Sequence, residues 1–258
     1  MEKKTKYYQI GSLKKGIRII DLLSRRGTLT LSEVAGELKL DRSVCHRYLL
    51  TLRDLGLVSQ PGGSGYRLTL RIFEMSMRLI NQLEIKKIVR PFMEDMTLEY
   101  KETVNLGIKD GDQVVYLDKS ESTQMLRAEL AIGSRIPIHC TALGKAILAF
   151  RPEGEQAAFC SGSGFKAYTP RTITSPKALM KQLTAIREKG FAVDDEEHFL
   201  GLRCVAAPLV DYSGFPNYSL SIAGPSSRLS NKRLMAIGSR LRSVCERISR
   251  ILGEIRTG

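Results

Sequence analysis

Several thiols, imidazoles and carboxylates in the C-terminal half of the chain could form a catalytic or metal site. Cys140 follows His139, and Cys204 could be combined with His198 and Asp194 as a thiol nucleophile with its base. Adjacent side chains rarely point at each other, however, and neither thiol lies in an oxyanion-hole motif. The histidines and cysteines also match no familiar spacing of metal ligands. We therefore expect no catalytic residues, no metal and no cofactor.

The segment around Lys145 could instead bind an anion. Gly144-Lys145 is followed by Ala146 and lacks the upstream glycine of a P-loop, which argues against a phosphate-binding loop of that type. Ala142, Leu143 and Gly144 lie at the expected start of a helix, where free backbone N–H groups favour an anion. We predict that these three residues bind a small anionic ligand.

Positive charge is concentrated in the N-terminal third. The chain has a formal net charge of +13, from 40 Lys and Arg against 27 Asp and Glu, and residues 1–85 hold 15 of the basic and 8 of the acidic residues. A basic module favours a polyanionic partner such as nucleic acid, although many basic surfaces bind nothing.

Three short helices are predicted before residue 57 to carry this charge. The first has an apolar repeat and ends before Gly27, and the second opens with a capping box between Thr30 and Glu33. Asp41 caps the third helix, which runs from Arg42 to Leu55. The apolar residues at helical spacing are Leu13, Ile17, Ile20 and Leu23 in the first helix and Val44, Tyr48, Leu52 and Leu55 in the third.

The third helix is predicted to read DNA. A helix-turn-helix places its second helix in the major groove, with the N-terminal half facing bases and phosphates. Residues 57–60 and 66–68, joined by a Gly-rich tip, read as a β-hairpin, which would make the module a winged helix. The alternative is a small helical bundle with a solvated face. The predicted DNA-binding residues are Ser32, Arg42, Ser43, Cys45, His46, Arg47 and Arg67.

Residue patterns across the chain resemble those of one family. Residues 40–49 read LDRSVCHRYL, and four later segments are 139–146 (HCTALGKA), 190–197 (GFAVDDEE), 201–208 (GLRCVAAP) and 219–225 (SLSIAGP). The later four are similar, in order and spacing, to the patterns H-x-T-A-x-G-K-A, G-[YF]-A-x-D-x-E-E, G-x-x-C-[VI]-A-A-P and S-x-S-x-[SA]-G-P. The chain resembles the IclR family of bacterial transcription regulators.

This resemblance implies an α+β protein with three parts. These are a winged helix-turn-helix (1–69), a linker helix (70–84) and a GAF-like α/β effector-binding domain (85–258). It also implies a homodimer or homotetramer bound to a palindromic operator on double-stranded DNA. The expected function is that of a regulator, typically a repressor, of a catabolic operon. The residues themselves do not distinguish repression from activation.

Periodicity supports the later elements. A linker helix is expected around Phe73, and a further helix over 85–100. Because Pro91 removes a backbone hydrogen bond, that helix should either start near Arg90 or kink there. Ser175-Pro176 is expected to open another helix, and a closing helix is expected over 231–252. Strands are expected at 103–108, 114–117, 204–210 and 218–222.

The resemblance also implies ligand residues. Asp194, Cys204 and Ser221 match positions that line the effector pocket in the family, and Ser219 is added as a neighbouring candidate. Taken singly, each has a simpler interpretation, such as a strand hydroxyl, a buried thiol or a solvated acidic loop. Some members that bind small oxo-acids have serine where this chain has Ala223. We therefore predict a small carboxylate effector, hydroxylated or aromatic, with its hydroxyl near Asp194.

The cysteine content and the absence of apolar runs bear on the cellular location. Five scattered cysteines form no C-x-x-C pair, so we expect reduced thiols. The sequence has neither a signal-peptide pattern nor a run of 18 apolar residues, so we expect no membrane association and a cytoplasmic location. A DNA-binding protein whose larger half only dimerises remains an alternative.

Overall fold

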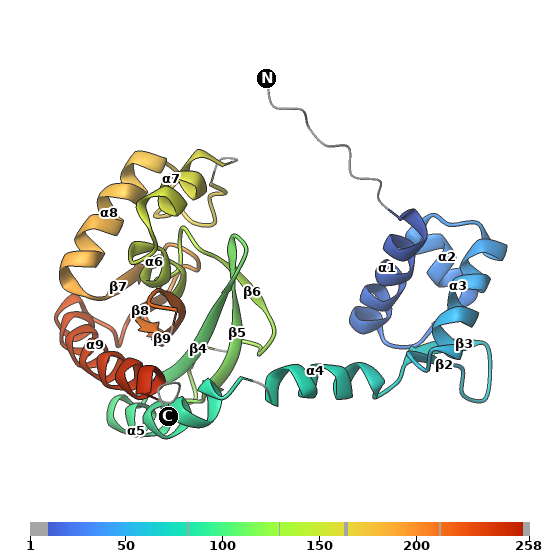
Figure 1. The fold of residues 1–258 in the computed structure, drawn as a ribbon, viewed down its shortest axis with the longest axis horizontal. Coiled ribbons are helices and arrows are strands. Elements are labelled where there is room, and N and C mark those ends of the chain that lie inside the picture. Colours follow the sequence, from blue (N-terminus) through green and yellow to red (C-terminus); the bar gives the residue numbers. More distant parts are fainter. Residues whose placement is uncertain (1–9, 82, 129, 163–164, 212, 255–258) are drawn as a thin grey trace. The chain divides into compact units, whose positions relative to one another are not determined.

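The chain forms two compact units, residues 1–83 and 84–258, in a computed structural model (Figure 1). The structure describes residues 10–81, 83–128, 130–162, 165–211 and 213–254. None of the helices described in these ranges is both long and apolar enough to cross a membrane.

The N-terminal unit is a winged helix, as predicted. Three helices are followed by a hairpin whose second strand also pairs with a short strand before the second helix, giving the order β1-β3-β2. This first strand was not expected from the sequence. The elements are α1 (Gly11–Arg26), β1 (Leu29–Thr30), α2 (Leu31–Leu38), α3 (Arg42–Asp54), β2 (Val58–Ser59) and β3 (Gly65–Leu68).

Side-chain caps define the N-termini of α2 and α3. The Thr30 hydroxyl accepts from the Glu33 N–H at 3.3 Å while the Glu33 carboxylate accepts from the Thr30 N–H at 2.7 Å, so the predicted capping box is present. Asp41 accepts from the N–H groups of Ser43 and Val44, as expected for an N-cap. These caps fix where α2 and α3 begin.

The last helix of this unit, α4 (Arg71–Asn81), has an exposed apolar surface. Phe73 is 60% exposed and Leu79 63% exposed, and Leu70 just before the helix is 76% exposed. The predicted linker helix is therefore present, with large apolar side chains on its outside.

The C-terminal unit is built on one antiparallel sheet in the order β6-β5-β4-β9-β8-β7. Helices cover both faces of this curled sheet (Figure 1). The strands are β4 (Thr103–Asp110), β5 (Gln113–Ser120), β6 (Arg135–Pro137), β7 (Ala192–Asp195), β8 (Leu202–Val210) and β9 (Pro216–Pro225). The helices are α5 (Ile85–Tyr100), α6 (Ala142–Ala149), α7 (Glu153–Ser161), α8 (Pro176–Lys189) and α9 (Asn231–Glu254). The fold class is that predicted from the sequence.

Helix α5 departs from one expectation. It spans Ile85–Tyr100, the predicted range, and continues through Pro91, so only the alternative of a start near Arg90 is wrong. Buried side chains at Ile85, Val89 and Met93 lie at helical spacing on both sides of the proline. Their packing outweighs the loss of one backbone hydrogen bond.

Candidate functional site

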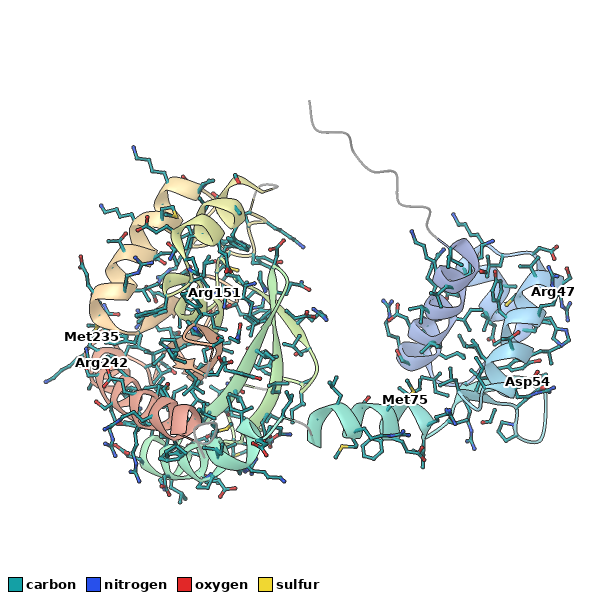
Figure 2. The ribbon with its side chains drawn as sticks, in the orientation of Figure 1. Arg47, Asp54, Met75, Arg151, Met235 and Arg242 are labelled. Atoms are coloured by element: carbon teal, nitrogen blue, oxygen red, sulfur yellow. The ribbon has the colours of Figure 1, made fainter. Side chains whose placement is uncertain are left out.

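The outer face of α3 presents the predicted DNA-reading side chains. Arg42, Ser43, His46 and Arg47 are exposed, and Arg47 points away from the body of the unit (Figure 2). The Ser43 hydroxyl donates to the Asp41 carboxylate at 2.6 Å, so it is partly committed to the cap. The arginines and the histidine give this face donors suited to phosphates and to guanine.

Cys45 does not belong to this face. Its side chain is 0% exposed and packs in the core with Leu49 and Leu52, so the prediction that Cys45 contacts DNA is wrong. The apolar stripe that packs on the other helices is Cys45, Leu49 and Leu52, whereas Leu55 is 56% exposed. The sequence allowed either of two helix faces to be the buried one, because apolar residues lie on two adjoining faces of α3.

Two further predicted DNA contacts lie outside α3. Ser32 is exposed in the first turn of α2, and Arg67 is exposed on β3 of the wing. Both positions stay predictions.

In the C-terminal unit, one face of the sheet is lined by small and polar side chains. The register pairs Asn105 with Ser221 and Asp194 with Cys204, and residues two apart on a strand share a face. Ser219 is therefore on the same face as Ser221, and its hydroxyl donates to the Leu143 carbonyl of α6 at 3.1 Å. The hydroxyl hydrogen of Ser219 thus holds α6 on the sheet.

The start of α6 lies against this face at short range. Thr141 caps the helix, since its hydroxyl accepts from the Gly144 N–H at 3.3 Å. A Cβ on Gly144 would lie 2.4 Å from the Ile138 Cα, so only glycine allows this approach. The N–H groups of Ala142 and Leu143 belong to the first turn, where the helix itself offers no acceptor. Both residues are themselves buried, at 1% and 2% exposure, and anion binding at this turn stays a prediction.

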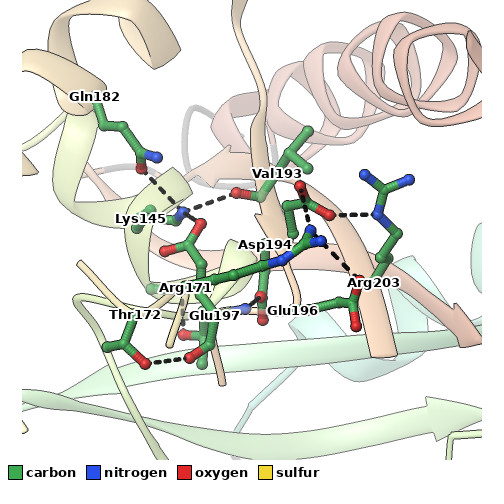
Figure 3. Close-up of polar contacts among 12 residues, drawn as sticks. Lys145, Arg171, Thr172, Gln182, Val193, Asp194, Glu196, Glu197 and Arg203 are labelled. Carbon is green, nitrogen blue, oxygen red and sulfur yellow. Dashed lines mark hydrogen bonds and ion pairs between the residues drawn. The ribbon is translucent and has the colours of Figure 1, made fainter. Parts of the chain in front are cut away.

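Lys145 is the centre of a buried polar cluster beside this helix start. Its side chain is 0% exposed, and its ammonium donates to Gln182 Oε1 at 2.9 Å, to the Val193 carbonyl at 2.8 Å and to the Glu197 carboxylate (Figure 3). These three acceptors match the three N–H groups of an ammonium. The sequence showed no signal for this cluster beyond the Gly-Lys pair.

Asp194 lies next to this cluster and is 3% exposed. Its Oδ1 accepts from the Glu197 N–H at 2.7 Å. Burial raises the pKa of Asp194 to about 7; the Lys145 ammonium opposes the rise and the Glu197 carboxylate adds to it. Near neutral pH this carboxyl group can therefore carry a proton and donate a hydrogen bond.

The next two acidic residues, Asp195 and Glu196, contact arginines and not the Lys145 cluster. Asp195 accepts from Arg171 at 3.0 Å and also pairs with Arg203, and Glu196 lies 3.4 Å from Arg171 (Figure 3). The acidic run is thus divided into an outer pair bound to arginines and an inner pair, Asp194 and Glu197. The solvated-loop interpretation applies only to the outer pair.

The thiols near Asp194 are poor nucleophiles. Burial raises the pKa of Cys140 to about 12, and burial also raises the pKa of Cys204 well above its usual value. A thiol that stays protonated does not attack a carbonyl. This argues against the thiol–histidine alternatives considered from the sequence.

An aromatic group lies near the same cluster. The rings of His139 and Phe165 stack at 4.8 Å, and Tyr168 meets His198 edge-on at 4.9 Å. Burial lowers the pKa of His139 and, with His139 nearby, lowers the pKa of His198 to about 4. Both imidazoles are therefore neutral near pH 7. The sequence did not predict this grouping, because its members come from distant segments.

Together, a winged-helix DNA-reading module and a sheet domain with a buried polar face define a DNA-binding regulator with a small-molecule-binding domain. Comparison with known proteins gives the same class. The family described as "IclR helix-turn-helix domain" matches residues 12–62, and "Bacterial transcriptional regulator IclR C-terminal" matches residues 77–250. The chain belongs to the IclR family of transcription regulators.

Individual relatives extend over nearly the whole chain. The transcriptional regulator KdgR of Escherichia coli is 35% identical over 245 residues, covering 95% of this chain and 93% of that protein. The transcriptional repressor AllR of Salmonella typhimurium is 33% identical over 244 residues, 94% and 90% of the two chains. An IclR homolog from Microbacterium hydrocarbonoxydans, solved in complex with 4-hydroxybenzoate, shares the fold with a TM-score of 0.79 at 20% identity, covering 93% and 99%.

These relatives are regulators rather than enzymes, and the chain is placed with them. No group of three or more histidine, cysteine, aspartate or glutamate residues within the described ranges is arranged to hold a metal ion.

Proposed function

We propose that this protein is a sequence-specific DNA-binding regulator controlled by a small carboxylate that also carries a hydroxyl group. The observation that carries the proposal is the polar sheet face under the start of α6, with Asp194 and Ser221 buried at 3% and 2% exposure. Burying polar groups costs free energy, so a site that keeps them favours a polar ligand. The 4-hydroxybenzoate bound by the Microbacterium homolog supports this class of ligand.

The ligand would bind across two elements. Its carboxylate would accept from the N–H groups of Ala142 and Leu143, and its hydroxyl would contact Asp194. Ser221 and Cys204 would line the same pocket. Ala223 pairs in register with Cys204 and offers no polar group, so a ligand with a larger apolar body suits this position better than a very small oxo-acid.

The regulated target would be a catabolic operon, and repression is the proposed mode because AllR is named a repressor.

Thermal melting against a panel of organic acids tests ligand control. A compound that binds only the folded protein raises its melting temperature, by an amount set by concentration over Kd. If every acid leaves the melting temperature unchanged, the larger unit does not sense ligands of this class.

Arg47→Ala is expected to weaken operator binding by about 1–3 kcal/mol if Arg47 contacts a base. Operator DNA can be obtained by selection from a random double-stranded pool and titrated by mobility shift. Arg25→Ala is the control, since Arg25 is exposed on α1 and pairs with Asp21. A base contact would weaken the operator more than unrelated DNA, whereas a phosphate contact would weaken both alike. If the Arg47 variant binds operator with wild-type affinity, the assignment of α3 as the DNA-reading helix is contradicted.

The protein is expected to bind as a homodimer or homotetramer to a palindrome. One α3 presents only a few base-reading side chains, so specific binding needs two modules on half-sites separated by whole helical turns. Sedimentation velocity at micromolar concentration gives the oligomeric state, and the selected sequences give the symmetry. A monomer that selects an asymmetric site would contradict this part of the proposal.

A further inference from the structure

Asn105 is a buried polar residue that neither the sequence patterns nor the DNA-reading surface accounts for. It lies on β4 and is 0% exposed. Its Nδ2 donates to the Ser221 hydroxyl at 3.5 Å, the long limit of a hydrogen bond. Its Oδ1 has no hydrogen-bond partner among the described residues. The amide is therefore held in the core with its acceptor unused.

An unused buried acceptor is costly, because the folded protein loses the water that would otherwise donate to it. An apolar residue would avoid this cost, as Val104 and Leu106 do on the opposite face of the same strand. Asn105 is paired in register with Ser221, a residue of the proposed pocket. Two residues further along β4, the side chains of Val114 and Leu143 fill the space that Gly107 leaves.

We propose that Asn105 is a further effector contact, whose Oδ1 accepts a hydrogen bond from the same ligand hydroxyl that contacts Asp194. This inference rests on the proposed effector binding and adds a selective role. A bare carboxylate has no proton to give to Oδ1, whereas a hydroxyl group does. The wild-type site therefore favours a hydroxylated carboxylate over its deoxy analogue, and the preference depends on Asn105.

The test compares Asn105→Leu with Thr97→Val. Thr97 has a buried hydroxyl on α5, which packs on the opposite face of the sheet; its one hydrogen donates to the Met93 carbonyl at 2.9 Å, and the Ser120 carbonyl lies 3.3 Å away as a second acceptor. Without ligand, Asn105→Leu is expected to melt at or above the wild-type temperature, because it removes an unpaired acceptor. Thr97→Val is expected to melt lower, because it removes a satisfied hydrogen bond.

The ligand arm uses 4-hydroxybenzoate with benzoate, and D-lactate with propionate, as pairs that differ by one hydroxyl group, followed by thermal shift and calorimetry on the full chain. In the wild type the hydroxylated member of a pair should bind more tightly by roughly ten- to a hundredfold. In Asn105→Leu that preference should fall to about one tenth of its wild-type value or less, and in Thr97→Val it should persist.

The outcomes distinguish a failure of this inference alone from a failure of the proposed effector class. If Asn105→Leu melts as low as Thr97→Val, Asn105 is a structural residue and the inference is wrong. If it melts normally but keeps the wild-type preference, the hydroxyl is recognised elsewhere and the inference is again wrong. If no probe shifts the wild type, the proposed effector class fails, and the role of Asn105 in recognising it fails too.

Discussion

Lys145→Met is expected to lower the free energy of unfolding by about 3–5 kcal/mol, the usual cost of removing one partner of a buried ion pair. Lys145 is 0% exposed and Glu197 is 4% exposed, and their contact is direct. Methionine fills much of the same space but donates to none of the three acceptors. It leaves Glu197 Oε1 without its cation, beside an Oε2 that already has no partner among the described residues.

Chemical denaturation, followed by fluorescence or circular dichroism, measures this change. The double variant Lys145→Met/Glu197→Gln should recover much of the loss, because it removes the stranded charge as well. Arg25→Ala is the matched surface control: Arg25 and Asp21 are 71% and 54% exposed, and such pairs contribute about 0–1 kcal/mol. A Lys145 variant as stable as the Arg25 variant would show that the cluster does not hold the domain together.

Asp194→Asn is expected to stabilise the protein above pH 8 and to leave its stability nearly unchanged near pH 4. In the folded state the pKa of Asp194 is raised from 3.8 to about 7. Between these values the folded protein holds a proton that the unfolded chain has lost, so wild-type stability falls as pH rises through this window. Above pH 8 the penalty approaches about 4 kcal/mol, since one pKa unit corresponds to about 1.4 kcal/mol. Asparagine removes the titration and can still accept from the Glu197 N–H.

Unfolding measured from pH 4 to pH 9 tests this difference. A constant gap between the two proteins across the range would mean that Asp194 does not titrate there. The same group predicts ligand behaviour: a carboxylate effector should bind the wild type about tenfold more weakly per pH unit above 7. The Asp194→Asn variant should lack that slope, because its carboxamide does not titrate. The sequence analysis placed the ligand hydroxyl near Asp194; with its pKa raised to about 7, Asp194 can donate a hydrogen bond to that group at neutral pH.

Much of the scaffold could be predicted from local patterns. Caps at Thr30, Asp41 and Ser175, and the strand over residues 103–108, depend on neighbours in the sequence and were identified correctly. The short strand β1 has no pattern of its own, because it forms only by pairing with β3. The predicted range of α5, 85–100, is confirmed, and only the alternative start near Arg90, suggested by Pro91, is wrong.

The interior of the candidate site was less accessible to sequence reasoning. Lys145, Gln182 and Glu197 meet only because α6, α8 and the segment after β7 converge. Cys45 was assigned to the wrong face because two phases of α3 look apolar. Asp194 and Asp195 are adjacent on β7 and therefore face opposite sides, but no strand was expected at 192–195 from the sequence. Asn105 offered no signal, because a single asparagine in a strand has many ordinary uses.

The most direct test of ligand-controlled DNA binding is a titration of selected operator DNA with the full protein, read by fluorescence anisotropy at fixed salt. It is run without additive and with each hydroxylated and deoxy carboxylate of the matched pairs. We expect at least one hydroxylated acid to change the operator Kd about tenfold or more, a coupling of about 1.4 kcal/mol. Its deoxy partner should have little effect. Operator binding that is unchanged by every acid, in a protein that also shows no thermal shift with any of them, would contradict the proposal that the larger unit is an effector domain.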